Sequence, residues 1–164
     1  MPEQWVLNAS PIIVLTRVGL ESLLWELPDR VVVPHSVVAE IEAGPADDPA
    51  RRVMTEGRFP VVDVIPVPEI LAWDLGAGET AVLSYALRHP EWSAVLDDAA
   101  ARKCARSFQI RFRGTLAVIL MARQRGLIPS AAEALRAVLQ AGFYLDERVI
   151  REALERTVGE RWVI

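Results

Sequence analysis

The sequence is poor in the sulfur and imidazole groups that build many functional sites. Cys104 is the single cysteine among 164 residues, which excludes an internal disulfide and a thiolate zinc site. His35 and His89 are the two histidines, and they lack metal-ligand spacing. Neither pairs with a serine or cysteine as a nucleophile–base couple. A chain without disulfides fits a reducing cytoplasm.

Long apolar runs are also missing. The longest fully apolar segment, residues 116–122, is far too short to cross a bilayer. The first residues lack the basic-then-apolar pattern of a signal peptide. The apolar fraction of 52% still supports a packed core, since a domain of this length buries roughly 68–70% of its unfolded surface. We therefore expect a globular, cytoplasmic protein without a membrane segment.

The glycine-rich nucleotide motifs are absent as well. The chain contains no GxGxxG, and no Lys-Ser or Lys-Thr follows Gly76-Ala77-Gly78. These absences disfavour a Rossmann-type nucleotide binder and a phosphate-binding loop. A flavodoxin-like receiver domain would place its acid pair after the first strand. Here the pair Asp97-Asp98 follows a late strand, which disfavours that fold too.

Short apolar segments alternate with amphipathic ones along most of the chain. The expected strands are about 5–8, 31–33, 61–65, 94–97 and 109–112. The expected helices are about 11–27, 34–44, 50–57, 79–88, 98–107 and 115–124. Because the strands are continuously apolar, we expect a central parallel sheet covered on both faces, which is a three-layer α/β/α fold.

The last part of the chain departs from this alternation. Ser130 and Glu133 form a capping box, Gly142 is placed to end the helix, and Asp146 caps a second helix to about 157. We expect an α/β domain over residues 1–129 and a helical hairpin over 130–164 that packs on the same domain. A dimer interface or a partner site are the alternatives for this hairpin.

Amide and acidic side chains follow two of the expected strands. Asn8 ends the apolar run 5–7, and Asp97-Asp98 end the run 94–96. Ligands of an open parallel sheet sit outside the carboxyl ends of its strands. Capping of the next helix accounts for one of the two adjacent aspartates but poorly for the second. A carboxylate cluster at this edge would hold a hard divalent cation.

Two glutamates could complete such a cluster. Glu79 begins an expected helix, where an acid also occurs for electrostatic reasons alone. Glu40 and Glu42 lie on opposite borders of an apolar helix stripe, so helix geometry does not choose between them. Thr115 is either an N-cap or a hydrogen-bond donor to a ligand carboxylate at the same edge.

The net charge of −4 disfavours a polyanionic partner, but the cations are unevenly distributed. Residues 102–113 contain no acid, and Phe108 and Phe112 lie between the basic side chains. The basic residues of this segment are Arg102, Lys103, Arg106, Arg111 and Arg113. A local basic patch binds phosphates whatever the total charge. The alternative is a solvated helix face and loop.

These residues stand in segments that resemble the PIN-domain family, specifically its VapC-like toxin branch of metal-dependent ribonucleases. The matching segments are VLNASPIIVLTRVGLESLLWEL, VVPHSVVAEIEAG, GAGETAVLSYAL, AVLDDAAARKCARSFQIRFRGT and LAVILMARQRGLIP. In this order they cover nearly everything from residue 5 to about 129. The trailing hairpin is similar to that of a poorly characterised PIN branch.

The resemblance implies four metal-ligand positions around Mg²⁺ or Mn²⁺ at the carboxyl edge of the sheet. In chain order they fall on Asn8, Glu40, Glu79 and Asp98, with Asp97 as neighbour or co-ligand. Ser10 and Thr115 match positions where the family often carries a small hydroxyl residue. Asn8 replaces the usual aspartate and brings no charge, which lowers the expected metal affinity and favours one metal over two.

The activity implied is endonucleolytic hydrolysis of RNA. The resemblance makes Glu40, Glu79, Asp97 and Asp98 the catalytic acids and the basic segment 102–113 the candidate for holding the RNA backbone. It also implies a cognate antitoxin protein and a second copy of the chain, in a homodimer, as partners. The alternative is a catalytically degenerate PIN domain that binds RNA or a protein without cleavage, for which Asn8 is the main support.

Overall fold

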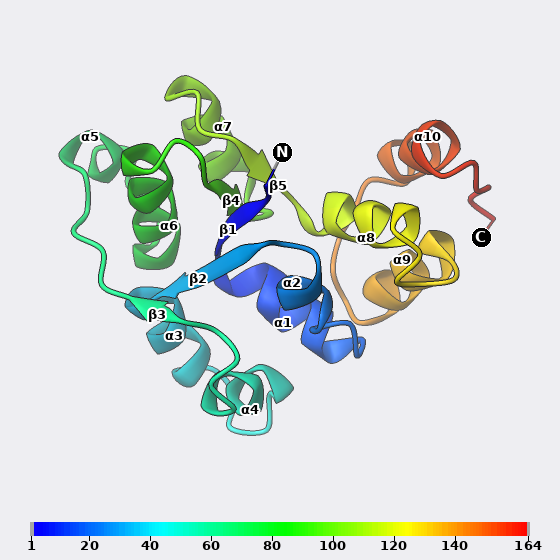
Figure 1. The fold of residues 1–164 in the computed structure, drawn as a ribbon, viewed down its shortest axis with the longest axis horizontal. Helices are drawn as coiled ribbons and strands as arrows, with labels where there is room; N and C mark the ends of the chain where they lie inside the picture. Colours follow the sequence, from blue (N-terminus) through cyan, green and yellow to red (C-terminus); the bar gives the residue numbers. More distant parts are fainter. Residues whose placement is uncertain (1, 164) are drawn as a thin grey trace.

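A computed structural model describes residues 2–163 and contains a five-stranded parallel sheet (Figure 1). The strands are β1 (Gln4–Leu7), β2 (Arg30–Pro34), β3 (Val61–Val62), β4 (Ser93–Val95) and β5 (Phe112–Arg113). Their order across the sheet is β3-β2-β1-β4-β5, and each neighbouring pair is parallel. From β1 the chain therefore adds β2 and β3 on one side. It then crosses back and adds β4 and β5 on the other side of β1.

The described residues contain ten helices. They are α1 (Ala9–Arg17), α2 (Leu23–Glu26), α3 (His35–Glu42), α4 (Pro49–Thr55), α5 (Pro68–Leu71), α6 (Ala77–Arg88), α7 (Ala99–Ser107), α8 (Thr115–Gln124), α9 (Ala131–Gln140) and α10 (Glu147–Thr157). Helix α6 packs across β1, β2 and β4 with α7 beside it, whereas α1 and α2 pack against α8. This arrangement confirms the predicted α/β fold with a helix-flanked parallel sheet.

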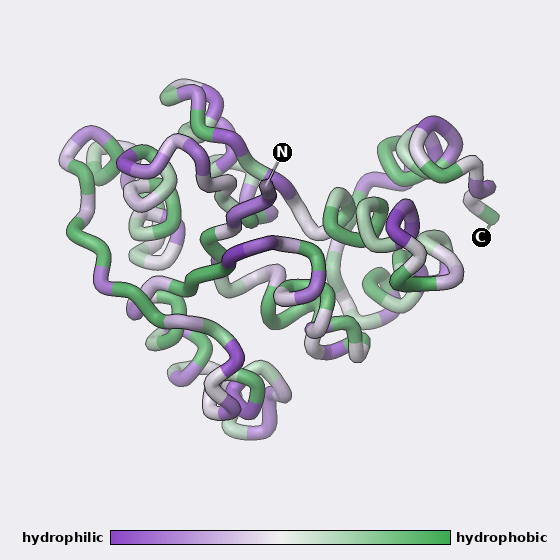
Figure 2. Tube along the Cα trace, viewed as in Figure 1, coloured by the Kyte–Doolittle hydropathy of each residue, from purple (hydrophilic) through white to green (hydrophobic). Residues whose placement is uncertain are grey.

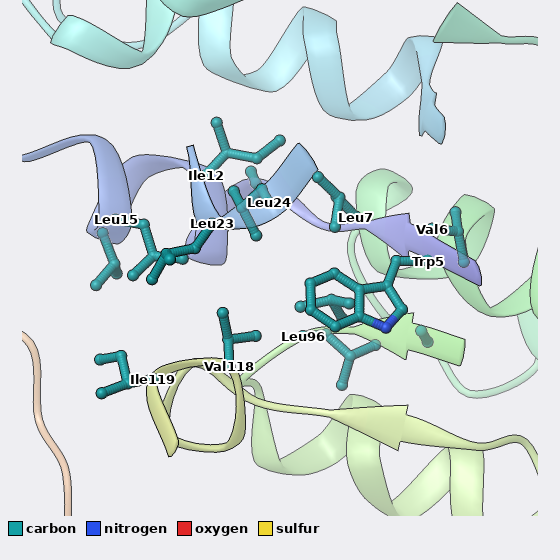
Figure 3. Packing of buried hydrophobic residues seen from close by; sticks show 14 of the residues in the cluster. Trp5, Val6, Leu7, Ile12, Leu15, Leu23, Leu24, Leu96, Val118 and Ile119 are labelled. Carbon is teal, nitrogen blue, oxygen red and sulfur yellow. The ribbon is translucent and has the colours of Figure 1, made fainter. Parts of the chain in front are cut away.

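The central strand is buried on both faces. Trp5, Val6 and Leu7 of β1 are fully buried, although successive side chains of a strand point to opposite faces. Figure 3 shows Trp5 on the side of the sheet that faces Val118 of α8, whereas Ile12 of α1 points to the opposite side, and all three belong to one hydrophobic cluster. Continuous rather than alternating hydrophobicity in this strand is thus a direct consequence of the helix layers on either side.

Three expected elements were wrong in extent, and the short helix α5 was not expected. The strand expected over 109–112 begins only at Phe112 and ends at Arg113, and Gln109 adopts a positive φ of 57° instead of extended backbone. The helix expected over 11–27 is interrupted after α1, because Gly19 adopts a positive φ of 74° and the Leu20 amide donates back to the Leu15 carbonyl at 2.8 Å. The strand expected over 61–65 ends at Val62. Its partner β2 ends at Pro34, where α3 begins directly, so no neighbouring strand is left for residues 63–65 to pair with.

The last two helices pack against α8 and extend the molecule on one side (Figure 1). Leu135 and Val138 of α9 and Ile150 and Leu154 of α10 are buried in the same hydrophobic cluster as the sheet. Figure 2 shows the hydrophobic character of α8 in contrast to the largely hydrophilic outer turn of α10. Among residues 2–163, no helix combines the length and apolarity needed to cross a membrane.

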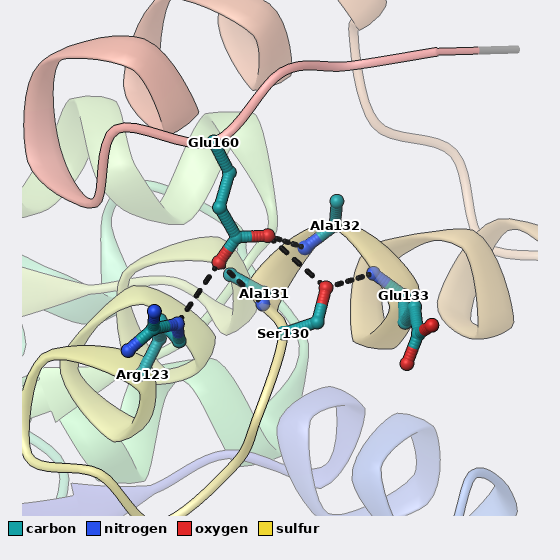
Figure 4. A network of polar contacts seen from close by, with 6 residues as sticks. All are labelled: Arg123, Ser130, Ala131, Ala132, Glu133 and Glu160. Atoms are coloured by element: carbon teal, nitrogen blue, oxygen red, sulfur yellow. Dashed lines mark hydrogen bonds and ion pairs between the residues drawn. The ribbon is translucent and has the colours of Figure 1, made fainter.

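The segment after α10 returns to the start of α9 through Glu160 (Figure 4). Its carboxylate accepts hydrogen bonds from the amides of Ala131 and Ala132, both at 2.9 Å, and from the Ser130 hydroxyl at 3.1 Å. Arg123 of α8 adds an ion pair at 3.2 Å. Burial acts to raise the pKa of Glu160, but the hydrogen bonds and Arg123 together hold it below its ordinary value.

Candidate metal site

The sheet topology brings the ends of β1 and β4 together. These strands are neighbours although β2 and β3 lie between them in the sequence, so the gap between them is the point where the strand order reverses. The backbone N–H of Asn8 donates a hydrogen bond to the Val95 carbonyl at 2.9 Å. Asn8 and Asp97 therefore follow the ends of two adjacent strands, at the edge where open α/β sheets bind their ligands.

Asn8 presents a buried oxygen that lacks a hydrogen bond. The residue is 2% exposed, and its Oδ1 has no hydrogen-bond partner within the described chain. Asn8 occupies the N-cap position of α1, yet its side chain makes no capping bond. An unsatisfied buried acceptor costs about 1–3 kcal/mol. Such an atom at a ligand-binding edge indicates a group that the protein itself does not supply.

Gly78 in the first turn of α6 leaves space beside that oxygen. A Cβ atom at this position would lie 3.1 Å from Asn8 Oδ1, 3.4 Å from Val37 Cγ2 and 3.5 Å from Glu40 Oε1. The amide oxygen of Asn8 and a carboxylate oxygen of Glu40 therefore converge on the same point from β1 and α3. The absence of a side chain at Gly78 keeps that space open.

Glu40 and Glu79 belong to two packed helices, α3 and α6. Burial raises the pKa of Glu40, and the charge of Glu79 raises it further. Glu79 lies in the first turn of α6, and its Oε2 would be 2.5 Å from a Cβ at the N-cap residue Gly76. Two mutually repelling carboxylates beside an unsatisfied amide oxygen form a donor set of hard oxygens, which fits Mg²⁺ or Mn²⁺.

Asp97 is held by hydroxyl and amide donors at the neighbouring strand end. Its carboxylate accepts hydrogen bonds from the Thr115 amide at 2.8 Å and the Thr115 hydroxyl at 2.7 Å. The Ser10 hydroxyl donates to it at 3.3 Å, and an Arg102 guanidinium nitrogen lies 3.8 Å away. The two hydroxyl residues named from the resemblance, Ser10 and Thr115, thus meet the same carboxylate.

Asp98 has a different environment from its neighbour. Its side chain accepts a hydrogen bond from the Ala101 amide at 2.9 Å and caps α7, and the residue is exposed. The preference for Asp98 as the fourth ligand came from the resemblance alone, and it stays a prediction. The Asp97 carboxylate instead accepts hydrogen bonds from Ser10 and Thr115, which lie in the first turns of the helices that follow β1 and β5.

Within residues 2–163, no three histidine, cysteine, aspartate or glutamate side chains lie close enough to hold a metal ion together. The predicted ligands form two neighbouring groups instead. Asn8 and Glu40 border the space at Gly78, with Glu79 close enough for its charge to act on Glu40, and Asp97 lies with Ser10 and Thr115. Side-chain rotation of Glu40, Glu79 or Asp97 is therefore needed before one cation can contact all of them.

The five basic residues of segment 102–113 differ in their contacts, although Arg102 and Arg113 line one surface cavity with Phe112. Arg102 lies 5.4 Å from the centre of the Phe112 ring and near Asp97, and the Arg106 guanidinium lies 5.1 Å from the centre of the same ring. Lys103 is exposed on α7. By contrast, Arg111 donates to the Pro90 carbonyl and Arg113 pairs with Glu3, so both reach toward the start of the strands.

One part of the site was not expected from the sequence. A pocket of about 120 Å³ opens beside Asp97, and the connection between α9 and α10 forms one of its walls. Phe143, Tyr144 and Leu145 supply that wall. An aromatic pair after the helix-ending Gly142 was the available signal, but nothing in the sequence places it beside Asp97.

Comparison with protein families assigns the chain. Residues 4–159 match the family model described as PIN domain (DUF3368). The chain therefore belongs to the PIN-domain family, a nuclease-type family whose members are typically metal-dependent, and the resemblance to PIN domains is confirmed. The matched region extends through α9 and α10 as well as the sheet. Comparison with curated proteins returned no match.

Proposed function

We propose that this protein is a metal-dependent endoribonuclease that hydrolyses RNA phosphodiesters with Mg²⁺ or Mn²⁺ held by Asn8, Glu40, Glu79 and Asp97. The observation that carries the proposal is the buried, unsatisfied Asn8 Oδ1 beside the space that Gly78 leaves open. Membership of the PIN-domain family supports the reaction class.

The chemistry that the cation supplies is neutralisation of charge on the scissile phosphate and activation of a water for in-line attack. The protein's own contribution is to place oxygen donors. Asn8 is fixed by β1 and its backbone bond to Val95, whereas Glu40 and Glu79 approach from α3 and α6. Thr115 and Ser10 orient the Asp97 carboxylate, which is the role that hydrogen-bond donors play behind metal ligands.

The cations of α7 are the candidates for RNA contact. Arg102, Lys103 and Arg106 belong to the helix that Asp98 caps, directly after the strand end that carries Asp97. Phosphate contacts of this kind fix the position of RNA without reading its sequence. Arg111 and Arg113 are engaged elsewhere, so we assign them no role in holding the substrate.

A catalytically degenerate PIN domain is the second candidate. The observation in its favour is the Arg102 guanidinium 3.8 Å from Asp97, because a protein cation there competes with a metal ion for the same carboxylate. The neutral Asn8 at the first ligand position acts in the same direction. In this case the protein binds RNA or a protein partner and does not cleave.

The toxin role, the antitoxin partner and the homodimer belong to the proposal through the resemblance to the VapC-like branch. Exposed apolar side chains on β3 and the segment after it, Val61, Ile65 and Leu71, offer contact area to a protein partner. Expression in a bacterial host tests this role. Growth arrest by the wild type, relieved in an Asp97→Asn variant, supports a toxin, and unaffected growth contradicts it.

The decisive experiment is cleavage of a mixed pool of tRNA and single-stranded RNA by purified protein with Mg²⁺, Mn²⁺ or EDTA. Asp97→Asn and Asp98→Asn are run in parallel. Asparagine remains a good N-cap, so Asp98→Asn preserves α7. We expect metal-dependent cleavage that Asp97→Asn abolishes and Asp98→Asn retains.

Equal activity in the wild type and Asp97→Asn would identify a contaminating nuclease and contradict the assigned roles. Loss of cleavage in Asp98→Asn alone would return the ligand role to Asp98. RNA binding without cleavage under either metal would favour the degenerate domain.

A further inference from the structure

The pocket beside Asp97 combines two kinds of wall. One side is polar and contains residues of the proposed site, whereas the other is apolar and comes from α1, α9 and the α9–α10 connection. The polar lining consists of Ser10, Asp97, Arg102 and Thr115, and the remaining lining consists of Val14, Val138, Phe143, Tyr144 and Leu145. A planar group with one apolar face and one polar edge matches this lining.

Tyr144 stands at this pocket with its side chain in solvent. It is 86% exposed, the largest fraction among the exposed large apolar and aromatic side chains of the described residues. Other rings are packed: Trp25 against Phe59, and Tyr85 against Trp92 and His89. In the described chain, no ring or arginine is stacked on Tyr144.

The backbone around Tyr144 is nevertheless fixed. Gly142 turns the chain at φ 97°, and the Phe143 amide donates back to Val138. The Phe143 ring lies under the Arg17 guanidinium at 5.6 Å. On the other side, Asp146 caps α10 through the Arg148 amide at 2.8 Å. The exposed ring is thus presented by an ordered connection, which reduces the entropic cost of using it to bind a ligand.

We propose that this pocket and Tyr144 form a base subsite for single-stranded RNA. The Tyr144 ring stacks on the base of a nucleotide next to the scissile phosphate, and Arg102 binds the phosphate of that nucleotide. The inference rests on the proposed ribonuclease function and names the part of the substrate that the site recognises, an unpaired base.

The size and charge of the pocket favour this occupant. Its volume of about 120 Å³ is below the roughly 300–1,000 Å³ typical of pockets for drug-sized ligands, so it accommodates a single ring rather than a whole nucleotide. Arg102 uses one donor on the Leu96 carbonyl and keeps a loose 3.8 Å approach to Asp97, so further N–H groups remain for a phosphate. Aromatic stacking together with arginine–phosphate contact is the usual chemistry of single-strand recognition.

Binding of a short fluorescein-labelled single-stranded RNA in EDTA, followed by fluorescence anisotropy, tests the subsite without a metal ion. The variants are Tyr144→Ala, Tyr144→Phe and the control Leu127→Ala, which removes another exposed apolar side chain. We expect Tyr144→Ala to weaken binding between about 5-fold and 150-fold, the range for loss of one base–aromatic stack. Tyr144→Phe and Leu127→Ala retain the wild-type affinity, because the ring is kept in one and untouched in the other.

The same comparison on duplex RNA supplies a second control, since paired bases cannot stack on the ring. Wild-type affinity in Tyr144→Ala, an equal loss in Tyr144→Phe, or the same loss on duplex RNA would each overturn the subsite. The cleavage assay, and not the binding assay, shows whether the nuclease proposal fails. Failure appears as no cleavage by the wild type with Mg²⁺ or Mn²⁺, whereas the anisotropy comparison in EDTA still decides on Tyr144.

Discussion

Thr115 donates two hydrogen bonds to Asp97, one from its backbone amide at 2.8 Å and one from its hydroxyl at 2.7 Å. Asp97 follows β4, and Thr115 begins α8 directly after β5, so the pair joins the ends of two neighbouring strands. The hydroxyl of Ser10, from the helix after β1, reaches the same carboxylate. One aspartate thereby ties together three successive strand ends of the sheet.

Removing the Thr115 hydroxyl tests how much its hydrogen bond to Asp97 contributes to stability. Thr115→Val keeps the shape and the backbone donor but removes the hydroxyl. We expect the free energy of unfolding to fall by about 1.5–2 kcal/mol, the lower part of the range for hydrogen bonds to charged groups, because the Asp97 side chain is 25% exposed. Urea denaturation in EDTA measures the change. Thr115→Ser is the control and should lose less, and a Thr115→Val variant as stable as the wild type would refute the prediction.

Substitution of Gly78 should separate metal binding from stability. A Cβ there lies 3.1 Å from Asn8 Oδ1 and 3.5 Å from Glu40 Oε1, so Gly78→Ala crowds both proposed ligands. We expect Mn²⁺ affinity, measured by calorimetry, to fall roughly 10–100-fold, as when groups that orient metal ligands are disturbed. Alanine is favoured over glycine in a helix by up to about 1 kcal/mol. The crowding at 3.1 Å from Asn8 Oδ1 offsets this gain, so thermal stability should change little.

The control for this variant is Ala77→Gly in the same helical turn. It should lower stability through helix propensity while leaving Mn²⁺ affinity unchanged, because Ala77 is exposed. Equal Mn²⁺ affinity in Gly78→Ala and the wild type would remove Asn8 and Glu40 from the proposed ligand set.

The fold could be predicted from the sequence where consecutive residues are all apolar and therefore buried. Trp5, Val6 and Leu7 read as a strand buried on both faces, and that pattern alone predicts a helix-covered parallel sheet. Extents that depend on distant partners were not predictable. The end of β3 is set by the end of β2 at Pro34, and the end of α1 depends on the conformation that Gly19 adopts.

The site shows the same division between local and distant information. Asp97 and Asp98 are adjacent and chemically identical, and their roles differ only because Ser10 and Thr115 are brought to Asp97 by the sheet order. The place of Tyr144 beside Asp97 depends on how α9 packs on α8. Neither relationship leaves a signal in the spacing of the residues.

The shifted titration of Glu40 predicts a pH-dependent effect on stability. Burial and the charge of Glu79 raise its folded-state pKa above the ordinary value of 4.5. The ionised side chain therefore destabilises the metal-free protein, and the destabilisation develops as the pH rises from 4.5 through the folded-state pKa. We expect Glu40→Gln to be more stable than the wild type at neutral pH in EDTA.

Thermal melts at pH 7 and below pH 4.5 measure this difference. The gain should vanish at the acidic end, where the wild-type side chain is protonated and resembles glutamine. Added Mn²⁺ should reverse the order at neutral pH, because it stabilises only the protein that retains its carboxylate. A Glu40→Gln variant that is less stable than the wild type in EDTA at pH 7 would show that Glu40 is not under electrostatic strain.

Glu160 is expected to show the opposite pH dependence. Its pKa lies below the ordinary value of 4.5, so its stabilising contribution is complete above pH 4.5 and disappears as the pH falls through the folded-state pKa. Glu160→Gln removes the charge opposite Arg123 and weakens the bonds to the Ala131 and Ala132 amides. We expect a loss of about 1.5–3 kcal/mol at pH 7, the range for hydrogen bonds to a charged group.

Glu133→Gln is the matched control for Glu160→Gln. Glu133 lies in the first turn of α9, beside the Ala131 and Ala132 amides that Glu160 binds. Its backbone amide, and not its carboxylate, takes part in the network (Figure 4). Urea denaturation should therefore show a difference between wild type and Glu160→Gln that is large at pH 7 and shrinks below pH 4.5, with little effect of Glu133→Gln at either pH. Because α9 carries the wall of the pocket beside Asp97, the Glu160 variant should also weaken single-stranded RNA binding more than Glu133→Gln does. A stability loss without any change in RNA affinity would show that the anchoring of α9 by Glu160 is independent of the base subsite.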